Sequence, residues 1–329
     1  MKASPAQTSF NAGELSPLLK GRPSLDKFKN GCEILENFIP QIQGPARKRP
    51  GTRFVAEVKD SADATRLLPF EYSISQAYVL EFGDLYVRFY LDGGVVESSP
   101  GVPLEVVSPY TSAQVGSLEY AQSADVIYIT HPEHPPYKLA RTSALVWTLT
   151  AVTFAWPPFN DENTGTTTIT ASALTGSITL TASASLFVAG DVGSYFKISE
   201  VSASKYNQWT TGVAHTSGDI VYYLGNIYQA GTTASAGTRP PIHTTGTESD
   251  GAVDWVFLHD GAGYARVTAY TSATVVTATV VKRLPTTSAT TRWSEGAWSN
   301  RRGHPHAVTF YEDRLWFAGS TSRPQTLWA

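Results

Sequence analysis

Cysteine is almost absent from this sequence, since Cys32 is the only one in 329 residues. A single cysteine excludes an internal disulfide framework and a cysteine-based zinc site, and it fits assembly in a reducing cytoplasm. Long apolar runs are also missing: no stretch of about 18 apolar residues occurs, and Met1–Pro5 is not followed by an apolar signal core. We therefore expect neither membrane insertion nor secretion.

Charge is scarce as well. Asp, Glu, Lys and Arg make up 16% of the chain, against roughly 25% in a typical soluble protein. The formal net charge of −3 gives no general attraction for nucleic acid, so such binding would need a local basic patch. Thr, Ser, Gly and Pro are abundant, as in proteins of short strands joined by turns. With 42% hydrophobic and 12% aromatic residues, the chain can fill two or three domain cores.

The order of the apolar residues predicts an all-β, multi-domain protein with one short N-terminal helix. Apolar residues recur at helical spacing only over Leu25–Phe38, and Pro40 would end that helix. Beyond it the pattern has period two. Gly83-Asp84 joins two alternating runs as a two-residue hairpin turn with Gly in the type II′ position, and Asp92-Gly93-Gly94 marks a second turn.

A weak internal repeat at an offset of 188 residues favours propeller-like antiparallel sheets. Residues 125–139 and 313–327 both show a strand, a five-residue turn, then Pro and another strand. Residues 84–89 echo the first half. Successive small sheets of this kind build β-propellers, in which each blade buries its faces against its neighbours. We expect residues 1–160 to form an N-terminal segment and a propeller-like region, and residues 291–329 to return to it.

Residues 161–205 and 264–290 contain Thr- and Val-rich strands that predict one β-sandwich or barrel. The segment between them, 206–263, interrupts this pattern with its own aromatic residues. We interpret it as a small β module inserted in a loop, which chains tolerate where the ends of the insert lie close together.

A set of short segments recurs in a known group of proteins: Ser9–Pro17, Asn30–Phe38, Arg49–Phe54, Tyr120–Asp125 with His131-Pro132, and Phe310–Gly319. As a set they resemble the nozzle proteins, or tail tubular proteins B, of short-tailed bacteriophages. The resemblance covers about residues 1–160 and 290–329, and no single segment carries chemistry.

The resemblance implies a structural subunit of the virion tail, assembled in the host cytoplasm. It further implies a homo-oligomer, a hexameric ring below the portal and adaptor, that contacts the tail adaptor and tail fibre proteins. Its propeller-like domains would surround a channel through which DNA is ejected without specific binding. Because the last residues look like a strand with no polar ending, we also expect the native polypeptide to continue beyond Ala329.

In the inserted module, a second resemblance rests on Tyr206 and Trp209, on Ser217–Ala230, and on Pro240-Pro241 before Trp255. These residues are similar to those of small chitin-binding carbohydrate modules. The possible glycan contacts of the module are Trp209, Tyr223, Tyr228 and Trp255. A unit this short needs its aromatic residues to form a core. In the sugar-binding modules, the corresponding segment carries exposed aromatic residues. This chain instead has Gly-Thr-Thr-Ala-Ser-Ala-Gly at residues 231–237. A decorating or spacing role is therefore preferred to glycan binding.

The candidates for chemistry are few, and we predict no catalytic, cofactor-binding or metal site. His131 and His134 could suggest a metal site, but the repeat places both in a turn, which we interpret as solvated. His304 and His306 would offer only two ligands, and two ligands rarely hold a metal ion alone. Glu312-Asp313 would point to opposite faces of a strand. Neither a Gly-x-Ser-x-Gly elbow nor a phosphate-binding loop occurs.

One basic cluster stands out, formed by Arg47, Lys48, Arg49 and Arg53 among Pro45, Pro50 and Gly51. Docking on an acidic face of a neighbouring subunit or the adaptor is the preferred interpretation. A solvated loop and contact with DNA are the alternatives. A channel that grips DNA would slow its transit, because each neutralised phosphate adds affinity.

Two classes of function therefore remain: a structural tail subunit, and a tail-associated glycan-binding adhesin or receptor-recognition protein. They differ in where the aromatic side chains of the inserted module lie. Exposed Trp and Tyr rings would favour the adhesin, because sugars stack on exposed ring faces. Buried rings would favour the structural role.

Overall fold

The computed structural model describes residues 6–73, 76–200 and 205–329. Over these residues about 45% of the chain is β-strand and 4% is helical, so strands are the dominant regular structure and the predicted all-β class is confirmed. The segment Met1–Pro5, used in the argument about a signal sequence, and residues 201–204, at the end of the first sandwich segment, lie outside the described residues. The helices in the described part are four 3-10 turns: η1 (Pro17–Leu19), η2 (Asp26–Asn30), η3 (Val115–Ser117) and η4 (Ala189–Asp191).

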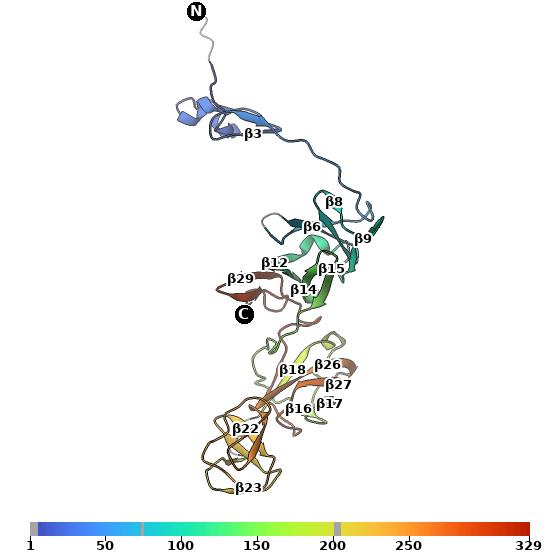
Figure 1. The fold of residues 1–329 in the computed structure, drawn as a ribbon, viewed down its shortest axis with the longest axis vertical. Helices are drawn as coiled ribbons and strands as arrows, with labels where there is room; N and C mark the ends of the chain where they lie inside the picture. Colours follow the sequence, from blue (N-terminus) through green and yellow to red (C-terminus); the bar gives the residue numbers. More distant parts are fainter. Residues whose placement is uncertain (1–5, 74–75, 201–204) are drawn as a thin grey trace, which may run out of the picture. The chain divides into compact units, whose positions relative to one another are not determined.

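The chain divides into two compact units, Met1–Ala56 and Glu57–Ala329. The boundary lies within residues 1–160, which the sequence analysis treats as one region. In Figure 1 the first unit is blue and the second runs from cyan to red. We describe each unit by itself.

The first unit contains two small pairs of strands. Strand β1 (Gly13–Glu14) lies parallel to β2 (Gly31–Cys32), and β3 (Phe38–Pro40) lies antiparallel to β4 (Ala46–Lys48). The helix expected over Leu25–Phe38 is wrong beyond its first turn. Only η2 forms, and the chain becomes extended at Gly31, where an added Cβ would lie 2.4 Å from the Leu15 side chain. Packing of β2 against β1 therefore overrides the helical spacing.

The second unit begins with two antiparallel sheets that share a core. The first sheet has the order β11-β7-β6-β5, with β8 paired to β7, and the second has the order β12-β13-β14-β15; a short pair, β9-β10, lies beside them. The strands are β5 (Arg66–Glu71), β6 (Ala77–Gly83), β7 (Tyr86–Leu91), β8 (Gly94–Val95), β9 (Glu97–Ser99), β10 (Val102–Pro103), β11 (Glu105–Val107), β12 (Glu119–Ser123), β13 (Val126–His131), β14 (His134–Ser143) and β15 (Val146–Ala151).

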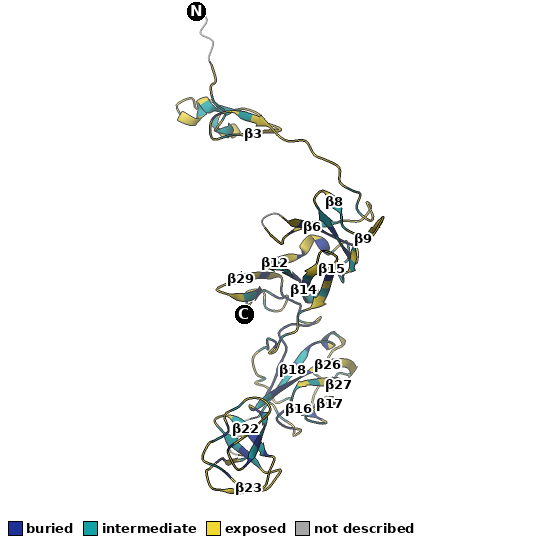
Figure 2. Ribbon diagram, in the orientation of Figure 1, coloured by how far each residue is buried: buried dark blue, intermediate teal, exposed yellow. Residues whose placement is uncertain are grey.

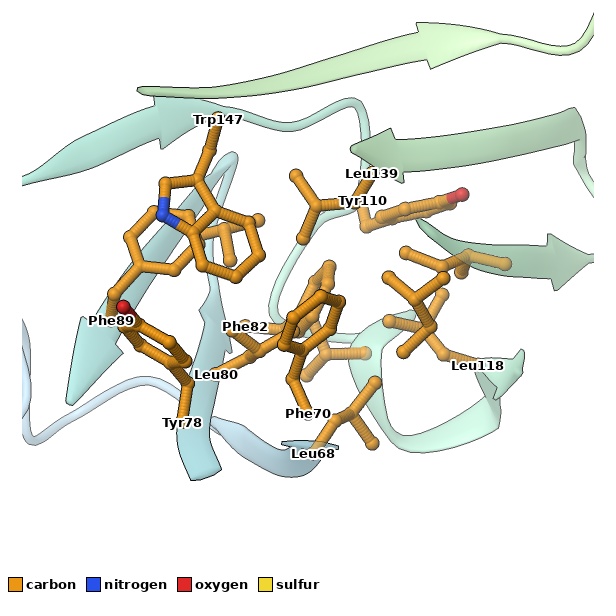
Figure 3. Close-up of a cluster of buried hydrophobic side chains, with 14 residues drawn as sticks. Leu68, Phe70, Tyr78, Leu80, Phe82, Phe89, Tyr110, Leu118, Leu139 and Trp147 are labelled. Atoms are coloured by element: carbon orange, nitrogen blue, oxygen red, sulfur yellow. The ribbon is translucent and has the colours of Figure 1, made fainter. Parts of the chain in front are cut away.

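The core between these two sheets is rich in aromatic side chains (Figure 3). Trp147, from β15, stacks on Phe89 with ring centroids 4.4 Å apart and meets the edge of Phe70 at 4.8 Å. Strand β5 alternates buried and exposed residues, so that Leu68 and Phe70 enter this core. The period-two pattern of the sequence thus puts one face of each sheet inward.

The hairpin turn predicted at Gly83-Asp84 lies one residue further along. Gly83 pairs with Tyr86, so the two turn residues are Asp84 and Leu85, and Leu85 has a φ of 62°. Gly83 remains in strand β6. An added Cβ there would lie 2.3 Å from the ring of Tyr86, so this glycine provides space for the ring. The second turn is as expected, with Asp92 and Gly93 both at positive φ.

The predicted sandwich or barrel is one six-stranded, half-barrel sheet with the order β16-β17-β27-β26-β18-β28. Its own core includes Phe187, Phe196, Leu180 and Trp293. The strands are β16 (Ile169–Ala171), β17 (Ser177–Ala182), β18 (Tyr195–Ser199), β26 (Ala262–Ser272), β27 (Val275–Lys282) and β28 (Trp293–Glu295).

A further sheet and core lie between β18 and β26. These two strands pair with each other, and Ser199 is opposite Ala262, so both ends of the intervening segment leave from one place in the sheet. The segment has a five-stranded sheet, β19-β21-β22-β25-β24, and a short pair, β20-β23. Its strands are β19 (Asn207–Gln208), β20 (Ala214–His215), β21 (Ile220–Tyr223), β22 (Asn226–Ala230), β23 (Ala234–Ser235), β24 (Thr247–Ser249) and β25 (Asp254–His259).

The chain then forms a three-stranded sheet of β29 (Ala307–Tyr311), β30 (Arg314–Ala318) and β31 (Leu327–Trp328). A core of Trp298, Val308 and Phe317 packs against Tyr128 and Phe154, so this sheet contacts the sheet β12–β15. The repeat is only partly reproduced. His131 pairs with His134 across a two-residue turn, whereas Ala318 pairs with Leu327 across residues 319–326, so the two copies do not share a five-residue turn.

Candidate functional site

The basic cluster is built on the two-stranded ribbon β3–β4, which we call the N-terminal ribbon. Its register pairs Phe38 with Lys48 and Ile39 with Arg47. Gly44, at a φ of 118°, allows the chain to reverse between the strands. The Arg49 amide donates to the Asn37 carbonyl at 2.8 Å and extends the pairing by one residue.

The structure brings three of the four predicted docking residues together. Arg47 and Lys48 lie in β4, Arg49 follows directly, and Arg53 lies in the strandless segment 49–65. All four side chains are exposed. Within the described residues none of them has an ion pair, so their charges are available to a partner.

The sequence analysis missed the exposed apolar side chains of the same unit. Phe38 and Ile39 are 47% and 49% exposed, and Ile42 and Phe54 are 90% and 75% exposed. Figure 2 shows this unit in yellow and teal. Within residues 6–56 the one buried residue is Gly44, which has no side chain. The expectation of a helix concealed this signal, because it placed Phe38 on an inward-facing stripe.

In the inserted module, two of the four possible glycan contacts are buried and the structure contradicts their assignment. Trp255 is fully buried, and its Nε1–H donates to Asp250 Oδ2 at 2.8 Å. Tyr228 is also fully buried, and its hydroxyl donates to the His243 carbonyl at 2.8 Å. Neither ring can present a face to a sugar.

The other two possible glycan contacts pack on each other. Trp209 is buried, Tyr223 is half-buried, and their rings meet edge to face with centroids 5.7 Å apart. Together the module's aromatics supply the core that a segment this short requires. Among the described residues of the module, its exposed large apolar side chains are aliphatic: Val213, Leu224 and Ile242.

The histidines of the first repeat copy lie in a packed junction, and the expectation of a solvated turn is wrong. His131 is buried, and its Nε2 lies 2.9 Å from the Ser117 hydroxyl. His134 Nε2 lies 3.0 Å from Gln114 Oε1, and the two imidazole rings are 5.3 Å apart. His304 joins them, because its amide donates to the Pro132 carbonyl at 2.9 Å.

Burial sets the protonation of this histidine junction. Desolvation lowers the pKa of His131 and of His134. It lowers the pKa of His304 to about 4, with repulsion from His134 as a further cause. All three imidazoles are therefore neutral at physiological pH. Among the described residues, no group of three His, Cys, Asp or Glu could hold a metal ion.

Glu312 and Asp313 do not lie along a strand as expected. They form the turn between β29 and β30, with φ values of 48° and 58°. The left-handed backbone of both residues explains the difference, because a two-residue hairpin turn needs such angles and Asp adopts them readily.

An aromatic cleft of about 680 Å³ lies elsewhere in the second unit. Its lining includes Trp156, Phe159, Trp298 and Trp328, together with Lys197. Trp156 is 46% exposed, and among the described residues Trp298 Nε1 has no hydrogen-bond partner. This cleft was not found from the sequence, because its two main lining segments, residues 154–160 and 298–329, are more than 100 positions apart in the chain.

The chain matches no protein-family model and no curated protein. In the described part of the chain, no helix is long and apolar enough to cross a membrane.

Proposed function

We propose that this protein is a structural subunit of a bacteriophage tail, of the nozzle type, that assembles as a homo-oligomeric ring around the DNA ejection channel. The contrast between its two units carries the proposal. Glu57–Ala329 has aromatic cores in every sheet region, whereas residues 6–56 bury no side chain and expose apolar groups and cations. A segment of that kind is stabilised by a partner, as in subunits of an assembly.

The segments that carry the nozzle resemblance support the same proposal. Ser9–Pro17, Asn30–Phe38 and Arg49–Phe54 belong to the first unit or lead out of it. Tyr120–Asp125 lies in β12 and the turn after it, and Phe310–Gly319 runs from the end of β29 through β30. In the second unit, small antiparallel sheets pack on one another around shared aromatic cores, as neighbouring blades do in a propeller-like protein.

Gold-labelled antibodies against the purified chain test this proposal on particles of the virus that encodes it. Label at the tail vertex is expected on most particles, together with loss of the tail when the gene is disrupted. Label on the capsid shell, or tails that form normally without the gene, would contradict it.

The glycan-binding alternative is favoured by one observation, the aromatic cleft around Trp156, and no longer by the inserted module. Sugar rings stack on exposed tryptophan faces, and Trp156 and Trp328 line one cleft. Titration with chitin oligosaccharides, followed by tryptophan fluorescence, tests it. Saturable quenching that Trp156→Ala removes would support an adhesin, and unchanged fluorescence would leave the structural role.

A further inference from the structure

The N-terminal ribbon has no core to hold it. Isolated two-stranded hairpins are only marginally stable in water, and both faces of β3–β4 are exposed. Across the register, Ile39 is opposite Arg47 on one face and Phe38 is opposite Lys48 on the other. Each face therefore combines an apolar residue with a cation, and a matching surface must offer apolar side chains beside carboxylates.

Charge is segregated along the chain in a way that identifies such a surface. Residues 1–56 carry nine Lys and Arg against four Asp and Glu, whereas residues 57–160 carry five Lys and Arg against twelve Asp and Glu. Complementary charge of this size guides association and fixes its register. The two-sheet region of the second unit is therefore the electrostatic complement of the ribbon.

One face of that region has the required combination. Leu67 and Glu71 lie on the same face of β5, which is the edge strand of its sheet, and Val79 lies beside them on β6, opposite Pro69. Leu67 is 60% exposed and Val79 is 41% exposed. Glu71 is exposed and, within the described residues, has no ion pair. We call this surface the β5–β6 face.

The connection between the units is long enough for an exchange between copies. Residues 49–65 contain no helix or strand, and a chain of that length spans at most roughly 55 Å when extended. Such a length would allow the ribbon to leave its own chain and reach a neighbouring copy.

We propose that the N-terminal ribbon of one copy docks on the β5–β6 face of a second copy of this chain. Phe38 or Ile39 covers Leu67 and Val79, while the cations of β4 pair with Glu71 and neighbouring carboxylates. This inference rests on the proposed function, in that it gives the contact by which the tail subunits associate. It also makes the first unit an exchanged arm.

Charge reversal in the full-length chain tests the contact. Arg47→Glu/Lys48→Glu/Arg49→Glu should weaken self-association at least about 10-fold in sedimentation velocity at physiological salt. The matched control, Arg22→Glu/Lys27→Glu/Lys29→Glu, makes the same charge change at exposed residues of the same unit and should change association less than about 3-fold. Adding Glu71→Lys to the ribbon variant should restore part of the loss.

Cross-linking identifies the acceptor chain. Full-length protein labelled with ¹⁵N is mixed with unlabelled protein and treated with a carbodiimide, which joins Lys48 to carboxylates that it touches. Mixed-isotope links from Lys48 to Glu71 are expected. Links within one isotope only would show that the ribbon folds back on its own chain and would overturn the proposal. In the sedimentation experiment, a monomeric wild type would also overturn it, and so would equal effects of the two triple variants.

These outcomes are separate from the test of the tail location. A protein that exchanges its arm in solution but is absent from the virion tail would contradict the proposed function alone. A tail protein whose Lys48 links only within its own chain would contradict this inference alone.

Discussion

Around Glu81, single residues decide how the hairpin β6–β7 is built. The carboxylate of Glu81 is fully buried and accepts hydrogen bonds from the hydroxyls of Tyr86 and Tyr90. Burial raises the pKa of both tyrosines, and the hydrogen bonds to Glu81 raise them further, so the hydroxyls stay protonated as donors. Gly83 provides the space in which the Tyr86 ring reaches this carboxylate.

We expect Gly83→Ala to destabilise the second unit by about 1–3 kcal/mol, because the new Cβ would overlap the Tyr86 ring. Urea unfolding followed by tryptophan fluorescence measures the change. Gly116→Ala is the control, since an added Cβ there meets nothing within 4 Å. Equal midpoints for the two variants would show that the ring moves aside at little cost.

This hairpin also shows what sequence can predict at the scale of a residue. The alternation of residues 77–90 located both strands, because it reflects which face is buried. The turn was misplaced by one residue, because glycine is read as a marker of positive φ. Here Leu85 adopts that angle and Gly83 serves a side chain that packs on it from three residues away.

The histidine junction predicts a loss of stability in mild acid. The pKa values of His131, His134 and His304 in the folded chain lie below the unfolded value of about 6.5, so protons bind preferentially to the unfolded chain. The contribution of the neutral imidazoles is complete above about pH 6.5 and is lost as the pH falls toward about 4. For His304 alone, it amounts to roughly 3 kcal/mol at most.

Urea unfolding at pH 7.5 and pH 5 measures this loss, and His304→Gln supplies the comparison. The variant cannot take up a proton at this position, so its stability should fall less between the two pH values than that of the wild type. An identical fall in both proteins would remove His304 from the account.

At the scale of the elements, tertiary packing decides whether an expectation from the local sequence pattern is correct, and the inserted segment is an example. Its aromatic residues were correctly expected to be needed for a core, and Trp255 and Tyr228 are at its centre. Their assignment as sugar contacts was wrong, because a ring that is buried in the core cannot also stack on a sugar. The Leu25–Phe38 helix failed for a related reason, since pairing of β1 with β2 begins at Gly31, inside the expected helix.

Deleting residues 206–258 and joining the ends with a short Gly/Ser linker should leave a folded remainder. The reason is that β18 and β26 pair directly, with Ser199 opposite Ala262, and this pairing lies within a few residues of each cut end along the chain. Thermal unfolding followed by circular dichroism at a strand wavelength measures the result. A cooperative transition is expected within about 5 °C of the full chain, and its disappearance would show that the segment is an integral part of the half-barrel sheet.

At the scale of the whole molecule, the segregation of charge between the basic first unit and the acidic residues 57–160 is the feature that connects sequence with assembly. The charges can be counted in the sequence, but only the cluster at Arg47 was recognised there, because the boundary between the two units was not. The apolar side chains exposed beside this cluster could not be identified from the sequence. Their exposure depends on whether the tertiary structure provides a core that covers them, and the order of residues alone does not show this.

Neutralising all four cations, with Gln at Arg47, Lys48, Arg49 and Arg53, should weaken tail assembly strongly and make the remaining association less sensitive to salt, because exposed charges act within about 8 Å at physiological salt. DNA ejection from particles that still assemble should be nearly unchanged in rate. Normal assembly with altered ejection kinetics would place these residues on the channel wall instead.

Cryo-electron microscopy of the purified full-length chain tests the central claim most directly, because a nozzle-type subunit must form a closed ring. We expect class averages that show a ring of identical subunits around an open channel, with density for the N-terminal ribbon on the β5–β6 face of the adjacent subunit. A protein that is monomeric at every concentration, or that forms open filaments with no channel, would contradict it.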